Sequence, residues 1–182
     1  MDRNIDGLNA RADELLKEGD DLMQGGQALR AEVCYQEALD LRQSVFSDFA
    51  FGTILPLGEC MVKLSDAALA RGDRQVAMDR IKEGAAMLDC DAECTGEVST
   101  HRKAADAYMK QGDLEQGALE TFEAFKQALE HLDAIPENDW NQEDVNDRIG
   151  LLGQLCIFAL SVGDAEAYHY HFHELQRMRA FL

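Results

Sequence analysis

The chain has 182 residues and a formal net charge of −18, from 35 acidic and 17 basic side chains. This negative charge repels phosphates and anionic lipids, so it argues against nucleic acid and membrane surfaces as partners. A hydrophobic content of 46% is typical of a globular protein with a core and excludes a disordered chain. The charge favours a basic or amphipathic polypeptide as partner, and the alternative is that it only keeps the surface solvated.

The sequence predicts a cytoplasmic location. The first residues, Met1 to Asp6, lack the basic start and the apolar run of a secretory signal. No run of apolar residues approaches the roughly 18–20 that are needed to span a bilayer. The cysteines are odd in number and mostly lie in helical patterns, which is typical of a reducing compartment. They are Cys34, Cys60, Cys90, Cys94 and Cys156.

Hydrophobic periodicity predicts an all-α chain of eight helices. Their ranges are near 5–24, 27–46, 54–71, 73–89, 97–111, 113–133, 142–162 and 164–180. Pro56 is expected in the first turn of the third helix, where its missing amide is tolerated. Residues 134–141 are the clearest linker, and Asn141 at its end is a candidate cap for the seventh helix. A second loop is expected at residues 90–95.

Four glycines each separate two of these helical segments: Gly26, Gly72, Gly112 and Gly163. The last three are each followed by aspartate. Glycine adopts the left-handed conformation that ends a helix, and aspartate caps the next helix by accepting from its free amides. The sequence therefore predicts four helical hairpins, at about 5–46, 54–89, 97–133 and 142–181.

The residues around these glycines are in register. Small residues stand seven positions before each glycine, and at most of the positions five and twelve after it, where they allow two helices to approach closely. Before the glycines they are Gly19, Ser65, Ala105 and Cys156, and after the first two they include Ala31, Ala77, Ala38 and Gly84. Repetition at these offsets indicates that all four hairpins share one design.

These spacings resemble the tetratricopeptide repeat (TPR) family over roughly residues 5 to 181. The first hairpin matches best, through Gly19, Leu22, Gly26, Ala31, Tyr35 and Ala38. The resemblance implies a right-handed α-solenoid of about eight antiparallel helices, a single domain over 1–182, and a protein-binding role without catalysis or cofactor. One departure is that the glycines are 46, 40 and 51 residues apart, against about 34 in the family.

The fourth hairpin departs from the pattern in another way. It carries Tyr168, Phe172 and Leu175 where small residues are usual. A terminal hairpin has no following repeat to accommodate, so larger residues are tolerated there. These side chains are expected either to fold back under the seventh helix or to form a homodimer contact.

In TPR-like proteins the first helix of each hairpin lines the concave surface, at positions about ten, six and three before the loop glycine. The resemblance therefore implies a peptide-binding groove formed by Leu16, Asp20, Met23, Val62, Asp66, Leu69, Arg102, Asp106 and Met109. An acidic row beside an apolar row suits a basic or amphipathic segment, and methionine adapts its shape to a ligand. The alternative for the methionines and Leu69 is packing between neighbouring first helices. The corresponding positions of the fourth hairpin hold Gly153, Ile157 and Leu160.

Two other functions remain open from the sequence. Cytoplasmic chaperones for type III secretion translocators are similar in length and acidity, which makes an adaptor or chaperone role of that kind one alternative. The other is a metal-binding or redox protein that uses the histidine run His169, His171 and His173, or Cys90 and Cys94. Phosphate-binding and dinucleotide-binding glycine motifs are absent from the sequence. We expect no enzyme.

Overall fold

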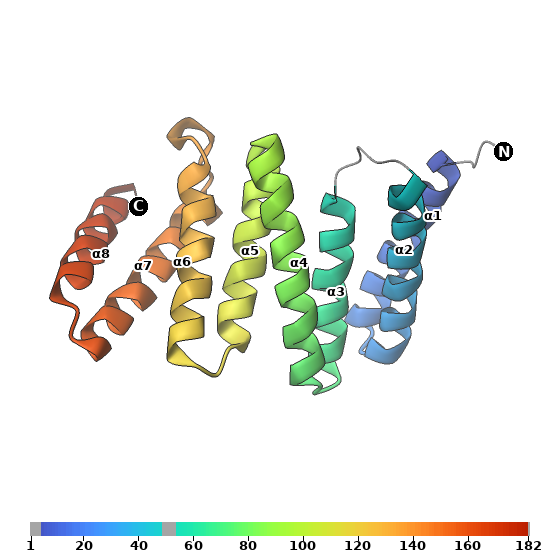
Figure 1. The fold of residues 1–182 in the computed structure, drawn as a ribbon, viewed down its shortest axis with the longest axis horizontal. Coiled ribbons are helices and arrows are strands. Elements are labelled where there is room, and N and C mark those ends of the chain that lie inside the picture. The colour runs from blue at the N-terminus through green and yellow to red at the C-terminus, as the bar shows by residue number, and fades with distance from the viewer. Residues whose placement is uncertain (1–4, 49–53, 182) are drawn as a thin grey trace. The chain divides into compact units, whose positions relative to one another are not determined.

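The computed structural model describes residues 5–48 and 54–181, and within these ranges it contains eight α-helices, two short 3₁₀ helices and no strand (Figure 1). The prediction of an all-α chain is confirmed. The chain divides into two compact units, Met1–Asp91 and Ala92–Leu182. Each unit has its own hydrophobic core. A single domain over residues 1–182 stays a prediction.

The first unit is built from two helical hairpins. Its helices are α1 (Ile5–Gln24), α2 (Ala28–Asp48), α3 (Leu55–Ala70) and α4 (Arg74–Thr95), the last of which continues past Asp91. Gly26 and Gly72 form the two turns with φ of 70° and 82°, as glycine after a helix end allows. Pro56 lies in the first turn of α3, and the carboxylate of Asp73 accepts from the amide of Val76 at 3.2 Å. These turn predictions are confirmed.

Small residues bring the helices of the first unit together, as the register predicted. Tyr35 of α2 is only 2% exposed and lies over Gly19 of α1. A Cβ atom at Gly19 would lie 2.3 Å from the Tyr35 ring, so only glycine fits without a shift. In the second hairpin, the buried hydroxyl of Ser65 donates to the carbonyl of Ala77 at 2.8 Å. The small residues therefore set the distance between the paired helices.

The second unit contains the remaining helices. They are α5 (Val98–Leu114), α6 (Ala118–Ala134), η1 (Glu137–Asp139), α7 (Gln142–Val162), α8 (Ala165–Met178) and η2 (Arg179–Phe181). Each of α5 to α8 packs on the next along the chain (Figure 1). Asn141 and Asp144 form a reciprocal capping box on α7, and Asp164 caps α8 by accepting from the amide of Ala167. The predicted caps and the turn at Gly163, with φ of 74°, are confirmed.

The predicted third turn, at Gly112, is wrong. Gly112 lies inside α5 and is buried against Phe125 of α6. Continuing the helix to Leu114 buries that leucine, and the chain turns instead between Glu115 and Gly117. Asp113 therefore does not cap α6. Positions counted backward from Gly112 are no longer equivalent to those counted from Gly26 and Gly72.

The predicted loop at residues 90–95 is also wrong, because α4 continues to Thr95 and ends at Gly96, whose φ is 66°. The carboxylate of Asp91 lies on this extra helical stretch and accepts from the backbone amide of Ile54 at 3.2 Å. Asp91 is buried. Extending the helix thus gives a buried carboxylate its hydrogen-bond partner, which a local loop signal does not reveal.

The expectation that no segment is long and apolar enough to cross a membrane is wrong for one helix, α7. Among the helices of the described ranges, Gln142–Val162 passes that test by length and composition. Core helices of soluble proteins pass the same test, and Leu151, Leu152 and Leu155 of α7 lie in the core of the second unit. Packing between α6 and α8 therefore accounts for part of the apolar composition of α7.

Candidate functional site

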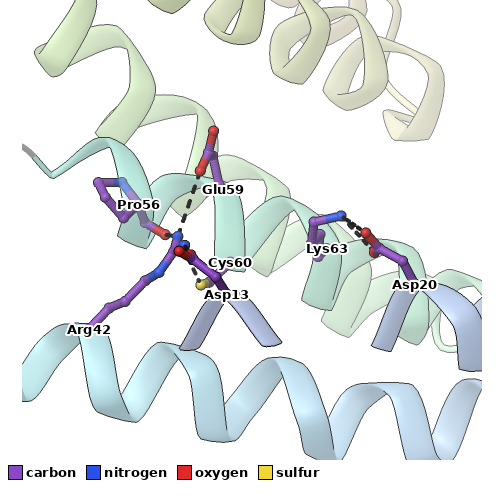
Figure 2. Close-up of polar contacts among 7 residues, drawn as sticks. All are labelled: Asp13, Asp20, Arg42, Pro56, Glu59, Cys60 and Lys63. Carbon is purple, nitrogen blue, oxygen red and sulfur yellow. Dashed lines mark hydrogen bonds and ion pairs between the residues drawn. The ribbon is translucent and has the colours of Figure 1, made fainter. Parts of the chain in front are cut away.

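Asp20, the first predicted groove carboxylate, is held by other side chains of the first unit. The hydroxyl of Tyr35 donates to it at 2.8 Å, and the ammonium of Lys63 lies 2.6 and 2.9 Å from its two oxygens (Figure 2). Burial, and then the hydrogen bond to Asp20, raise the pKa of Tyr35. Asp20 thus joins α1 to α2 and α3, and its charge is balanced within the protein. Lys63, which precedes Asp66 by one turn of α3, was not among the residues predicted from the sequence.

A second polar cluster of the first unit centres on Arg42 of α2, whose side chain is mostly buried. One nitrogen bonds Asp13 of α1 at 2.7 Å. Another donates to the carbonyl of Pro56 at 2.8 Å and lies 3.6 Å from Glu59, both of α3 (Figure 2). Because the guanidinium bridges three helices, its role is structural.

The predicted apolar row is largely packed inside each unit. Leu16 is buried in the first core and offers almost no surface to a ligand. Met23 and Met109 are half-buried and pack against the cores of the first and second units, respectively. Val62 is half-buried, and Leu69 is 40% exposed. Both methionines thus contact a core, and Leu69 is the member of the row with the most exposed surface; the groove itself stays a prediction.

Arg102, another predicted groove residue, is bound to the start of α7. Its guanidinium forms paired hydrogen bonds with the carboxylate of Asp144, at 2.9 Å through Nε and 2.8 Å through Nη2. It also donates to the carbonyl of Asp139 at 2.6 Å. Paired hydrogen bonds of this kind orient both side chains. Arg102 thus fixes α5 to the linker that precedes α7.

Asp20 and Asp66 lie in the first unit and Asp106 in the second, so a row through all three stays a prediction. Asp66 is half-exposed on α3, and Asp106 is exposed on α5. Although Asp106 is exposed as a residue, neighbouring protein removes part of the water around its carboxylate; this, and after it the carboxylates of Asp147 and Glu143, raise the pKa of Asp106 to about 6. Lys110 opposes this shift. At neutral pH the charged form of Asp106 is therefore less favourable in the folded protein than in the unfolded chain.

Replacing Asp106 with asparagine should stabilise the protein near neutral pH. Between the ordinary aspartate pKa of 3.8 and about 6, the folded state holds a proton that the unfolded state has released, so this group makes stability fall as pH rises. The variant should unfold at a higher temperature than the wild type at pH 8, and the difference should vanish near pH 4. Thermal unfolding at both values measures this. An equal difference at both would exclude the titration of Asp106 as its cause.

The sequence analysis did not identify an apolar pocket between α6 and α7, of about 280 Å³. We call it the α6–α7 pocket. Its lining is Gln116, Ala118, Thr121, Phe122, Phe125, Gln154, Leu155, Ile157, Phe158 and Ser161. The rings of Phe122 and Phe158 stack there at 4.3 Å. Ile157 and Leu160 could have indicated a binding surface from the sequence, because the other hairpins carry an aspartate and an apolar residue at the corresponding positions.

A second pocket of the same unit, of about 350 Å³, is lined by charged residues of both signs and by apolar residues. Arg148 is buried within it, with its guanidinium 3.8 Å from the centre of the Trp140 ring and 3.6 Å from Asp133. Arg177 pairs with Glu174 at 3.0 Å. Both arginines face carboxylates of the same unit, although Nε and Nη2 of the buried Arg148 have no hydrogen-bond partner among the residues that the structure describes, and the pocket offers no nucleophile with an adjacent base.

The histidine run and the cysteine pair are not assembled as ligand sets. His169 and His173 are exposed, and burial lowers the pKa of the half-buried His171. Cys90 and Cys94 are exposed on a helix, where the sequence predicted a loop. Across residues 5–48 and 54–181, no three side chains of histidine, cysteine, aspartate or glutamate form a group that could hold a metal ion.

No protein-family model matches the sequence, and no curated protein matches it. Solved structures do match. Two crystal structures of a kinesin light chain-like protein of Podosopora anserina, with nearly identical TPR-like repeats, align along most of both chains. One has 15% identity, covers 93% of this chain and 85% of that chain, and gives a TM-score of 0.52. The other has 14% identity, covers 98% and 87%, and gives 0.53. The fold is TPR-like. At these identities the likeness concerns the fold alone.

Proposed function

We propose that the protein is a non-enzymatic interaction module of the cytoplasm, an adaptor, scaffold or chaperone that binds a basic or amphipathic segment of another protein. TPR-like folds commonly bind other proteins, which supports the general part of this proposal. The charged side chains of the clusters around Asp20, Arg42 and Arg102 bind other residues of the same chain. A partner is therefore expected to bind the exposed surface outside these clusters.

The observation that carries the proposal is exposed apolar surface on a strongly acidic chain. Ile157 and Leu160 of α7 are 63% and 61% exposed, although the net charge is −18. Single exposed apolar residues are ordinary, whereas apolar residues clustered at a pocket are typical of binding surfaces. A ligand that covers them in acidic surroundings needs an apolar face and basic flanks.

Only part of the predicted groove on the first helices is retained in this proposal. Asp66 is half-exposed and Leu69 is 40% exposed on α3, while Leu16 is buried and Asp20 is paired with Lys63. A segment that binds there would displace or share the Lys63 contact. We therefore expect the first unit to contribute charge more than affinity, since exposed ion pairs are worth only about 0.2–1 kcal/mol each.

The C-terminal hairpin offers part of its predicted aromatic surface. Leu175 is buried, whereas Phe172 is 39% exposed and stacks on Tyr168 at 5.6 Å. A homodimer through this hairpin is a further proposal. Light scattering over a concentration series tests it directly, because a dimer of this kind should dissociate on dilution and a monomer should not change in mass.

Two matched peptides test the proposed function. One is an amphipathic helix of about 18 residues with a leucine face and lysine on the other face, and the second has glutamate in place of every lysine. We expect fluorescence anisotropy to show saturable binding of the lysine peptide, weakened between about 50 and about 500 mM sodium chloride. The glutamate peptide should not bind. Equal binding of the two, or binding of neither, would contradict the proposal.

A further inference from the structure

The α6–α7 pocket lies between two helices, and Ile157 of its lining is 63% exposed. Leu119 in the first turn of α6 and Leu160 in the last turn of α7, which are 60% and 61% exposed, neighbour lining residues in the sequence but are not part of the lining. The stacked rings of Phe122 and Phe158 show that these two helix ends are adjacent. An apolar pocket with an exposed aliphatic side chain in its lining is a usual site for a docked helix.

The charge of the surrounding chain restricts what can dock there. Two stretches, residues 111–125 and 149–176, supply every residue that lines the pocket, and neither contains a lysine or an arginine. Their acidic residues are Asp113, Glu115, Glu120, Glu123, Asp164, Glu166 and Glu174. The pocket is thus largely apolar, and the chain segments that form it carry mostly negative charge at neutral pH; the exposed Lys126, which directly follows Phe125, lies 3.8 Å from Glu130.

We propose that the α6–α7 pocket binds the apolar face of an amphipathic helix of a partner protein whose flanking residues are basic. This inference rests on the proposed function and gives it a place on the molecule. Apolar side chains of the ligand, spaced by three and four residues, would cover Ile157 and Leu160 and enter between the rings and Thr121. Lysine or arginine beside them would meet the acidic residues that precede α6 and follow α7, which raises the rate of association and selects against acidic helices.

The lysine peptide and two pairs of neutral substitutions test the location. The pocket variant carries Ile157→Gln and Leu160→Gln, and the control variant carries Leu29→Gln and Val33→Gln on α2, where the native residues are 65% and 58% exposed. All four side chains are exposed, so both variants should keep the wild-type unfolding temperature. We expect the pocket variant to bind the lysine peptide roughly tenfold more weakly and the control to bind it as the wild type does. Ile157→Gln alone, with a smaller loss, provides the same comparison if the double variant unfolds.

A second pair of variants tests the charge. Glu123→Gln with Glu166→Gln should weaken binding severalfold at low salt, while Glu18→Gln with Glu37→Gln in the first unit should change it less. Binding to the wild type that survives unchanged in the pocket variant would overturn the location and leave the proposed function standing. Failure of the lysine peptide to bind the wild type would instead overturn the proposed function. A concentration-dependent dimer of the wild type that the pocket variant abolishes would also overturn the inference, because a second copy would then be the occupant.

Discussion

Replacing Asp144 with alanine is expected to destabilise the protein by about 2–4 kcal/mol. This buried carboxylate has two structural roles. It accepts the paired hydrogen bonds of Arg102, and it closes the capping box by accepting from the backbone amide of Asn141 at 2.8 Å. The substitution leaves the Arg102 guanidinium unpaired and the first turn of α7 without half of its cap. Urea unfolding at neutral pH, followed by circular dichroism, measures the loss.

Asp139→Ala is the matched control, because Arg102 contacts the carbonyl and not the side chain of Asp139. It should leave stability unchanged within about 0.5 kcal/mol. The dependence of stability on pH provides a second test of the role of Asp144. Burial acts to raise the pKa of Asp144, but the hydrogen bonds from Arg102 and Asn141 outweigh it and the pKa is lowered. Its stabilisation is therefore present above the ordinary aspartate pKa and is lost as pH falls below it. A loss in Asp139→Ala equal to that in Asp144→Ala would contradict this role.

One substitution, glycine to alanine, is expected to have opposite effects at two helical positions. At Gly19 a Cβ atom would lie 2.3 Å from the ring of Tyr35, which is buried and hydrogen-bonded to Asp20. The helices must separate, at about 1–3 kcal/mol. At Gly150 of α7 nothing lies within 4 Å of a new Cβ, so alanine should stabilise by about 0.5–1 kcal/mol through its better helix propensity.

Thermal unfolding of the two variants beside the wild type measures both effects. Gly19→Ala should lower the midpoint and Gly150→Ala should raise it. A Gly19→Ala midpoint equal to or above that of the wild type would show that α1 and α2 do not approach each other at Gly19. The packing of the first hairpin, from which the resemblance to TPR repeats was drawn, would then be wrong.

Local chemistry explains why much of the fold follows from the sequence. A turn such as that at Gly26, Gly72 or Gly163 requires a glycine with positive φ, and Asn141 and Asp164 cap through atoms only three residues away. Such signals are complete within one segment of chain. Gly112 shows the limit of this reasoning. It carries the same Gly-Asp signal, but close packing against Phe125 and burial of Leu114 decide its conformation, and both depend on a neighbouring helix.

The candidate site was less predictable for the same reason. Counting from loop glycines indicated which residues share a helix face, but it could not show that Lys63 neutralises Asp20 across 43 residues of sequence or that Arg102 binds Asp144 across 42. Long-range ion pairs leave no periodic trace. Ile157 and Leu160 did leave a periodic trace, because they are apolar at positions where the other hairpins carry an aspartate and an apolar residue. The sequence alone does not show that both side chains are exposed.

The most direct measurement is the mapping of the lysine peptide onto the protein by NMR of its isoleucine, leucine and valine methyl groups. We expect the signals of Leu119, Ile157 and Leu160, and of Val162 beside them, to shift on titration in proportion to the bound fraction. The signals of Leu29 and Val33 on α2 should not move. Shifts confined to residues 5–91, or spread evenly over exposed methyl groups of the whole protein, would contradict the binding of a basic amphipathic helix at the α6–α7 pocket.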